Sequence, residues 1–267
     1  MEFDSGKRVS TMEALQSGLI APKSPAWREV LDWPLPASNL RDRLLLRTLA
    51  FAACGRVRAV HGLEHIAPEN DPIVLVANHN TRREALLVPG LLVFYRGGRL
   101  IRFLADWNFR LIPGIGFIYR RSGAITVTRK SARPRFLNLL KPIYRDPLTS
   151  LERARRHLAN GHSVGTFPEG TVNRDSARLL VGRTGAARLS LEARVPVVPM
   201  GIRFPEATAE RPGPMELFIG APRRPPAATK TPAPFSAVRE WHASIMTDIA
   251  RLSGKEWSRR KGGGNED

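Results

Sequence analysis

Short apolar runs alternate along this chain with longer segments whose apolar residues recur at helical spacing. Runs that end at turn residues predict strands, here at 56–61, 72–77, 100–104, 123–129, 163–167 and 195–202, with an edge strand at 215–219. The longer spacing predicts helices, at 85–94, 151–160, 184–192 and 235–252. Because strands alternate with helices, we expect a single α/β domain with a largely parallel or mixed sheet flanked by helices.

A segment before the first strand has a different pattern. Residues 39–54 interleave leucines with arginines at near-helical spacing, which predicts a basic amphipathic helix. Such a helix either lies on an anionic bilayer or docks on its own domain, and the pattern leaves both open. We divide the chain into a loose N-terminal arm at 1–38, a folded domain at 39–254 and a charged, Gly-rich, disordered tail at 255–267.

The charge of the chain points to an anionic partner. Its 267 residues include 42 Lys and Arg against 24 Asp and Glu, a net charge of +18. Residues 96–145 contain 12 basic residues and one acidic residue, Asp106, which gives +11 in this window alone. Such a window favours phosphate head groups, a phosphorylated substrate or cofactor, or nucleic acid. No nucleic-acid motif accompanies it and aromatic residues are few there, so we expect an anionic membrane surface and no nucleic acid.

Cysteine content and hydropathy bear on the compartment. Cys54 is the single cysteine, which excludes an intrachain disulfide. No stretch approaches the ~20 apolar residues of a membrane-spanning helix, and the N-terminal residues are polar and acidic, unlike a secretory signal peptide. We expect a cytoplasmic protein, either soluble or lying on a membrane surface.

The candidate chemistry is centred on 76–84, where an apolar strand ends at His79 and a helix begins near Glu84. His79 is expected at the carboxyl end of that strand, where open α/β sheets carry their active sites. With His79 in the turn and Glu84 in the first helical turn, the carboxylate can fix the imidazole tautomer and stabilise the imidazolium. His79 is then a candidate general base for a hydroxyl. Thr81 and Glu84 also form a capping box, which explains Glu84 without catalysis, and one carboxylate can serve both roles.

Two further segments place polar residues after strands. At 167–171 a turn puts Glu169 at its tip, and Arg174 follows shortly. Arginines pair with phosphate oxygens and a carboxylate accepts from a hydroxyl, so this set suits a phosphate-bearing substrate. Arg129 closes another strand and reaches the same sheet end if the strands are parallel. Ordinary surface ion pairs and a solvated strand-end arginine are the alternatives.

Four motifs occur in a characteristic order: Asn-His-(x4)-Glu, Gly-Ala-Ile-Thr-Val-Thr-Arg, Phe-Pro-Glu-Gly-Thr and Val-Pro-Val-Val-Pro-Met-Gly. Together they resemble the lysophospholipid acyltransferase family, the glycerol-phosphate and acylglycerol-phosphate acyltransferases, over about 55–220. The resemblance implies an α/β domain at the cytoplasmic face of the cell membrane, attached peripherally. It also implies transfer of an acyl chain from acyl-CoA or acyl-carrier protein to a hydroxyl.

The resemblance also implies roles for single residues. His79 matches the catalytic base of the family, and Glu84 matches its acidic partner. The residues that match the acceptor-binding part are Arg129, Glu169, Gly170 and Thr171.

Several positions depart from the family pattern. Glu84 stands where the family usually has Asp, so a longer arm must reach His79. Thr126 and Thr128 replace the usual Phe and Asp before the strand-end arginine, and Val172 replaces an arginine for which Arg174 is a substitute. The last three departures fall on the acceptor side and leave the acceptor open.

We therefore expect an O-acyltransferase that acylates a hydroxyl of a lysophospholipid such as 1-acylglycerol-3-phosphate, with His79 as general base. Neither a cofactor nor a metal is expected, because the histidines and acids form no metal-binding pattern. One alternative is the same chemistry on a non-glycerophosphate acceptor, such as a lyso-aminolipid, a glycolipid or a specialised metabolite. The other is a non-catalytic, basic, membrane-binding relative.

Overall fold

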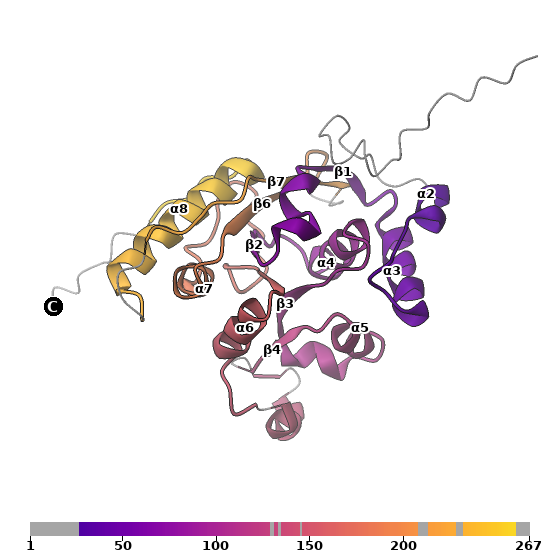
Figure 1. Cartoon of the computed structure of the whole chain (residues 1–267), viewed down its shortest axis with the longest axis horizontal. Coiled ribbons are helices and arrows are strands. Elements are labelled where there is room, and N and C mark those ends of the chain that lie inside the picture. The colour runs from indigo at the N-terminus through magenta and orange to yellow at the C-terminus, as the bar shows by residue number, and fades with distance from the viewer. Residues whose placement is uncertain are drawn as a thin grey trace, which may run out of the picture.

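The computed structural model describes residues 27–128, 131–132, 135–144, 146–207, 213–227 and 232–259. Its strands are Val57–His61 (β1), Val74–Ala77 (β2), Ile101–Asp106 (β3), Ile125–Val127 (β4), Ser163–Thr166 (β5), Val197–Arg203 (β6) and Met215–Ile219 (β7). Within the described residues they form one sheet in the order β1-β7-β6-β2-β5-β3-β4 (Figure 1). This confirms the predicted single α/β domain.

The sheet is mixed, with parallel pairing dominant. Each neighbouring pair is parallel except β6 and β7, which run antiparallel. The prediction that 215–219 forms an edge strand is wrong, because β1 pairs along the outer side of β7 with Val57 opposite Met215. The carboxyl ends of β2, β3, β4, β5 and β6 therefore lie at one edge of the sheet.

Helices cover both faces of the sheet. The α-helices of the described residues are Trp27–Asp32 (α2), Leu40–Ala53 (α3), Glu84–Tyr95 (α4), Ile115–Arg121 (α5), Ser150–Ala159 (α6), Gly185–Ala193 (α7) and Phe235–Ser253 (α8). Strand β2 alternates between the faces: Leu75 and Ala77 pack with α2, α3 and α4, whereas Val74 and Val76 pack with α6, α7 and α8. The result is a three-layer arrangement with two hydrophobic cores, one on each side of the sheet (Figure 1).

The helix predicted at 39–54 is present as α3, but a basic amphipathic character is not confirmed. Leu46 and Leu49 are buried in contact with the domain, and Gly90 of α4 leaves room for Leu49, whose Cδ1 would lie 2.7 Å from a Cβ at that glycine. Leu40 and Leu44 point the other way and are exposed. Apolar side chains thus occur on both sides of α3, and one side docks the helix on its own domain.

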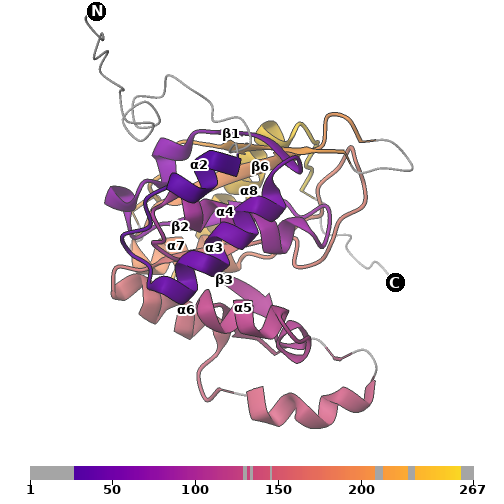
Figure 2. The same ribbon diagram turned by 90° about the vertical axis from the view of Figure 1, so that its right-hand side faces the viewer.

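The described residues also form four 3-10 helices. They are Leu63–Ile66 (η1), Pro68–Asn70 (η2), Trp107–Leu111 (η3) and Arg135–Tyr144 (η4). Figure 2 shows η4 at the lower end of the molecule, beyond α5. None of the described helices is both long enough and apolar enough to cross a bilayer.

The two ends of the chain differ from their predicted divisions. Residues 1–26 and 260–267 lie outside the described residues, while 27–38 begin with α2. Residues 255–259, which we assigned to the disordered tail, lie against 177–179 in the structure. Leu179 N donates to Glu256 O at 2.8 Å and Glu256 N donates to Ala177 O at 2.7 Å.

A buried ion pair joins elements at the amino edge of the sheet. The Asp71 carboxylate, 3% exposed, accepts from Arg96 Nη2 at 2.7 and 2.6 Å and also bonds Arg99 and Ser163. Asp71 precedes β2, Ser163 begins β5 and Arg96 follows α4. This cluster therefore fixes α4 to the sheet at the end opposite the candidate site.

Candidate active site

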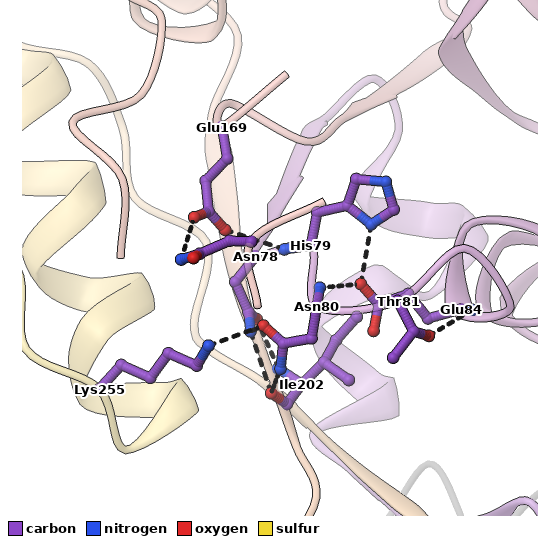
Figure 3. A network of polar contacts seen from close by, with 9 residues as sticks. Asn78, His79, Asn80, Thr81, Glu84, Glu169, Ile202 and Lys255 are labelled. Carbon is purple, nitrogen blue, oxygen red and sulfur yellow. Dashed lines mark hydrogen bonds and ion pairs between the residues drawn. The ribbon is translucent and has the colours of Figure 1, made fainter. Parts of the chain in front are cut away.

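The turn after β2 is fixed to β6 by Asn78. This side chain is fully buried; its Oδ1 accepts from Ile202 N at 2.7 Å, and its Nδ2 donates to Ile202 O at 3.0 Å. Satisfied in this way, a buried amide costs little and acts as a fixed point. The next residue, His79, is therefore held at the carboxyl edge of the sheet (Figure 3).

His79 and Glu84 meet as predicted. His79 Nδ1 lies 2.8 Å from Glu84 Oε1, the Glu84 side chain is fully buried, and His79 is 14% exposed (Figure 3). With the proton on Nδ1 donated to Glu84, the acceptor atom of the ring is Nε2, on the side away from the carboxylate. The ring also stacks on Phe167, with centroids 4.7 Å apart, so its plane is fixed as well.

The same carboxylate also holds the turn before α4, a helix whose N-cap residue is Arg83 and which has no side-chain cap. Glu84 Oε1 accepts from Asn80 N, and Glu84 N donates to Thr81 Oγ1 at 3.4 Å. The predicted capping box is therefore wrong, because Glu84 is the first residue of α4 rather than its third, and its carboxylate reaches the N–H of Asn80 rather than that of Thr81. Glu84 thus has two contacts at once: it accepts from the backbone of the turn and faces the imidazole.

Glu169 lies behind His79 rather than on the wall of the cleft. It is 6% exposed; Oε1 accepts from His79 N at 3.0 Å, while Oε2 accepts from Asn173 Nδ2 at 2.7 Å and Leu180 N at 3.0 Å. Asn173 N in turn donates to His79 O at 2.7 Å. Both carboxylate oxygens are thus engaged by the protein, and they tie the loop after β5 to the backbone of His79.

The other predicted site residues are distributed around this centre. Gly170 has φ +67°, a conformation that favours glycine, and a Cβ there would come within 2.9 Å of Arg183 Nε. Gly170, Thr171 and Arg174 line the same cleft as His79. Arg129 lies outside the described residues, although β4, which precedes it, ends at the same edge of the sheet.

Lys255 is a site residue that the sequence analysis missed. Its Nζ donates to Asn80 Oδ1 at 2.8 Å (Figure 3) and to Asp175 O at 2.6 Å, and the side chain lines the cleft. Burial lowers the pKa of Lys255, and the carboxylates of Glu169, Asp175 and Glu84 oppose that lowering. No local motif marks this lysine, because packing of the segment after α8 brings it to the site.

The cleft has an apolar and a cationic part within a volume of about 2250 Å³. Its apolar walls come from α3, α4 and α5, for example Leu45, Leu86 and Ile118. Its described lining includes seven basic side chains, Arg82, Arg83, Arg121, Arg135, Arg174, Arg203 and Lys255, against three acidic ones, Asp42, Asp106 and Asp175. In the part of the chain that the structure describes, no three His, Cys, Asp or Glu side chains are grouped so as to hold a metal ion.

The model of the Acyltransferase family matches residues 57–203, more than half of the chain, and the chain belongs to this family. The family membership expected from the four motifs is thereby confirmed.

Individual relatives carry more specific names. A chloroplastic 1-acyl-sn-glycerol-3-phosphate acyltransferase of Brassica napus and one of Arabidopsis thaliana are each 27% identical to this chain over 141 residues. These alignments cover 53% of this chain but only 36% and 34% of the relatives, so the match spans about a third of their length.

One solved structure shares the fold. The crystal structure of the 1-acyl-sn-glycerophosphate acyltransferase PlsC from Thermotoga maritima aligns with a TM-score of 0.53 at 18% identity. The alignment covers 86% of this chain and 89% of that chain. The agreement supports the same α/β architecture.

Proposed function

We propose that this protein is an O-acyltransferase that moves a fatty acyl chain from an acyl thioester to a hydroxyl of a lysophospholipid such as 1-acylglycerol-3-phosphate. The observation that carries the proposal is the His79–Glu84 pair, 2.8 Å apart, whose histidine lines a cleft that is partly apolar and partly cationic. Membership of the Acyltransferase family and the names of the relatives support the reaction and the acceptor class.

In the proposed reaction His79 is the general base. Its Nε2 takes the proton of the acceptor hydroxyl while Glu84 stabilises the imidazolium that forms. The hydroxyl oxygen attacks the thioester carbonyl and forms a C–O bond. The tetrahedral intermediate then collapses with cleavage of the C–S bond, and the departing thiolate receives the proton from His79. Ester and free thiol are the products, and no cofactor or metal takes part.

Binding of the acceptor phosphate is assigned to basic residues near His79. Arg174 is exposed on the cleft, and Lys255 keeps one of its three N–H donors for a ligand, because Asn80 and Asp175 use the other two. Arg129, which the resemblance assigns to the acceptor, is a further candidate for the phosphate, although it lies outside the described residues. Glu169 serves by positioning His79, because both its oxygens already accept from the protein.

The donor and the location are further parts of the proposal. An acyl-CoA or an acyl-carrier protein supplies the acyl thioester, and the apolar walls formed by α3, α4 and α5 suit a fatty acyl chain. The protein acts peripherally on an anionic membrane surface at the cytoplasmic face, which the net charge of +18 supports.

The test is acceptor-dependent thiol release from a long-chain acyl-CoA, with lysophosphatidate dispersed in detergent and products identified by mass. His79→Ala is expected to lower turnover by about 10²–10⁴-fold, the usual effect of removing a general base. His157→Ala on α6, outside the cleft, is the matched control and is expected to retain turnover.

The two alternatives give different results in the same assay. Thiol release with a lyso-aminolipid or glycolipid, but not with lysophosphatidate, would support acyl transfer to a different acceptor. Absence of thiol release with every acceptor, from both acyl-CoA and acyl-carrier-protein donors, would indicate a non-catalytic membrane-binding protein. Equal turnover by wild type and His79→Ala would refute the role of His79.

A further inference from the structure

The helix η4 is attached to the domain along one of its three ridges. A 3-10 helix has about three residues per turn, so residues three or six apart share a ridge. Asn138 and Tyr144 share one: Asn138 Oδ1 accepts from Ala132 N at 2.8 Å, and the Tyr144 ring lies 5.8 Å from that of the fully buried Trp107. Four apolar side chains on the two remaining ridges are exposed, whereas Leu137, at the start of one of these ridges, lines the cleft.

These two outer ridges are apolar and exposed. Phe136 and Leu139 lie on one, with 67% and 82% of their surface exposed, and Leu140 and Ile143 lie on the other, with 38% and 73% exposed. None of the ten residues of η4 is buried. A contiguous apolar surface of this kind marks an interaction site rather than ordinary surface variation.

The surrounding charge selects the kind of partner. Residues 107–145 contain no acidic residue, and Arg135 and Lys141, which share the ridge of Asn138 and Tyr144, flank the two apolar ridges. Helices that combine an apolar face with flanking Lys and Arg lie in the interface of anionic bilayers, where the long basic side chains reach the head groups. We infer that η4 is the segment by which this protein docks on an anionic phospholipid bilayer, with its apolar ridges inserted among the acyl chains.

The position of η4 connects this docking with the active site. Ala132, Arg135 and Leu137 line the same cleft as His79, as do Ile112 and Ile115 from the neighbouring segment. A lipid that leaves the bilayer at η4 therefore enters the cleft along an apolar wall. This consequence rests on the proposed acyltransferase function, whereas the docking itself does not.

The experiment measures binding of the full chain to vesicles of phosphatidylcholine with and without phosphatidylglycerol. Leu139→Ser is expected to weaken binding to the anionic vesicles about tenfold, because burial of one such side chain contributes at least that much. Leu40→Ser on α3 is a matched control, since Leu40 is 81% exposed against 82% for Leu139. Phe136→Ser and Phe235→Ser form a second pair, at 67% and 63%, with Phe235 on α8.

The inference predicts weaker binding for Leu139→Ser and Phe136→Ser, and near wild-type binding for Leu40→Ser and Phe235→Ser. Equal Tm values are expected for all four variants, because the altered side chains lie outside the cores. Loss of binding in Leu40→Ser with none in Leu139→Ser would overturn the inference and assign docking to α3. A dimer that forms without lipid and that Leu139→Ser dissociates would also overturn the inference, because the partner of η4 would then be a second copy of the chain.

Activity distinguishes a failure of docking from a failure of the proposed function. Leu139→Ser is expected to release thiol normally with detergent-dispersed acceptor and more slowly with acceptor held in vesicles. Equal rates for Leu139→Ser and wild type on vesicles would overturn the link between η4 and acceptor delivery. Absence of thiol release by the wild-type protein would refute the proposed function and leave the vesicle-binding result standing.

Discussion

Replacing Glu84 with glutamine isolates one of the two tasks of this side chain. Glu84→Gln keeps an oxygen that can accept from Asn80 N, so the turn before α4 retains this hydrogen bond. It removes the negative charge 2.8 Å from His79 Nδ1. The substitution therefore tests the charge of the pair while leaving the turn in place.

The expected magnitude follows from the geometry. The centres of the imidazolium and the carboxylate lie roughly 4 Å apart, and two unit charges at that distance attract by about 4 kcal/mol at an effective dielectric constant of about 20. At about 1.4 kcal/mol per tenfold change in rate, loss of this attraction corresponds to roughly 10³-fold in kcat. The glutamine oxygen still accepts from Nδ1–H and so recovers part of this stabilisation. A loss of about 10²–10³-fold in kcat is therefore expected.

The assay is thiol release at saturating acyl-CoA and lysophosphatidate, with Tm measured alongside. Glu84→Gln should lower kcat, leave KM for both substrates nearly unchanged and keep Tm close to the wild-type value. Glu84→Ala should add a loss of about 1 kcal/mol in the free energy of unfolding, because it leaves Asn80 N without its acceptor. A kcat for Glu84→Gln within a few-fold of wild type would refute the role of the charge.

Two further perturbations address the acceptor and the scaffold. Lys255→Met is expected to raise KM for lysophosphatidate about tenfold or more while leaving KM for acyl-CoA nearly unchanged. Because burial lowers the pKa of Lys255, its charge is lost at a lower pH than on an exposed lysine. Wild-type KM for lysophosphatidate should therefore rise with pH, and Lys255→Arg should remove the rise, since arginine stays charged; a pH-independent wild-type KM would contradict this role. Asp71→Ala leaves the buried Arg96 unpaired and is expected to lower the free energy of unfolding by about 3–5 kcal/mol in urea titrations. Its kcat per folded molecule should not change, and a fall in kcat at full folding would contradict a purely structural role.

The sequence predicts the centre of the site because its contacts are local. His79 and Glu84 are separated by one turn, and a strand followed by a helix leaves few ways to arrange five residues. The continuous apolar run of β2 likewise predicts a buried strand, and the structure places Leu75 in one core and Val74 in the other.

The remaining features depend on contacts between distant parts of the chain. Lys255 reaches Asn80 across 175 residues, through the packing of α8 on β6, and no local pattern encodes that approach. The inner position of β7 depends in the same way on β1, which is far away in the sequence. Glu169 has the same sequence context whether it faces substrate or protein, and only the folded loop reveals its three protein donors.

The central claim is that His79 transfers a proton during acyl transfer to a lipid hydroxyl. The most direct measurement is formation of mass-labelled phosphatidate from labelled acyl-CoA and lysophosphatidate, compared between the wild type, His79→Ala and His157→Ala. The account predicts labelled product from the wild type and from His157→Ala, and about 10²–10⁴-fold less from His79→Ala. Equal product from His79→Ala at equal Tm would contradict it.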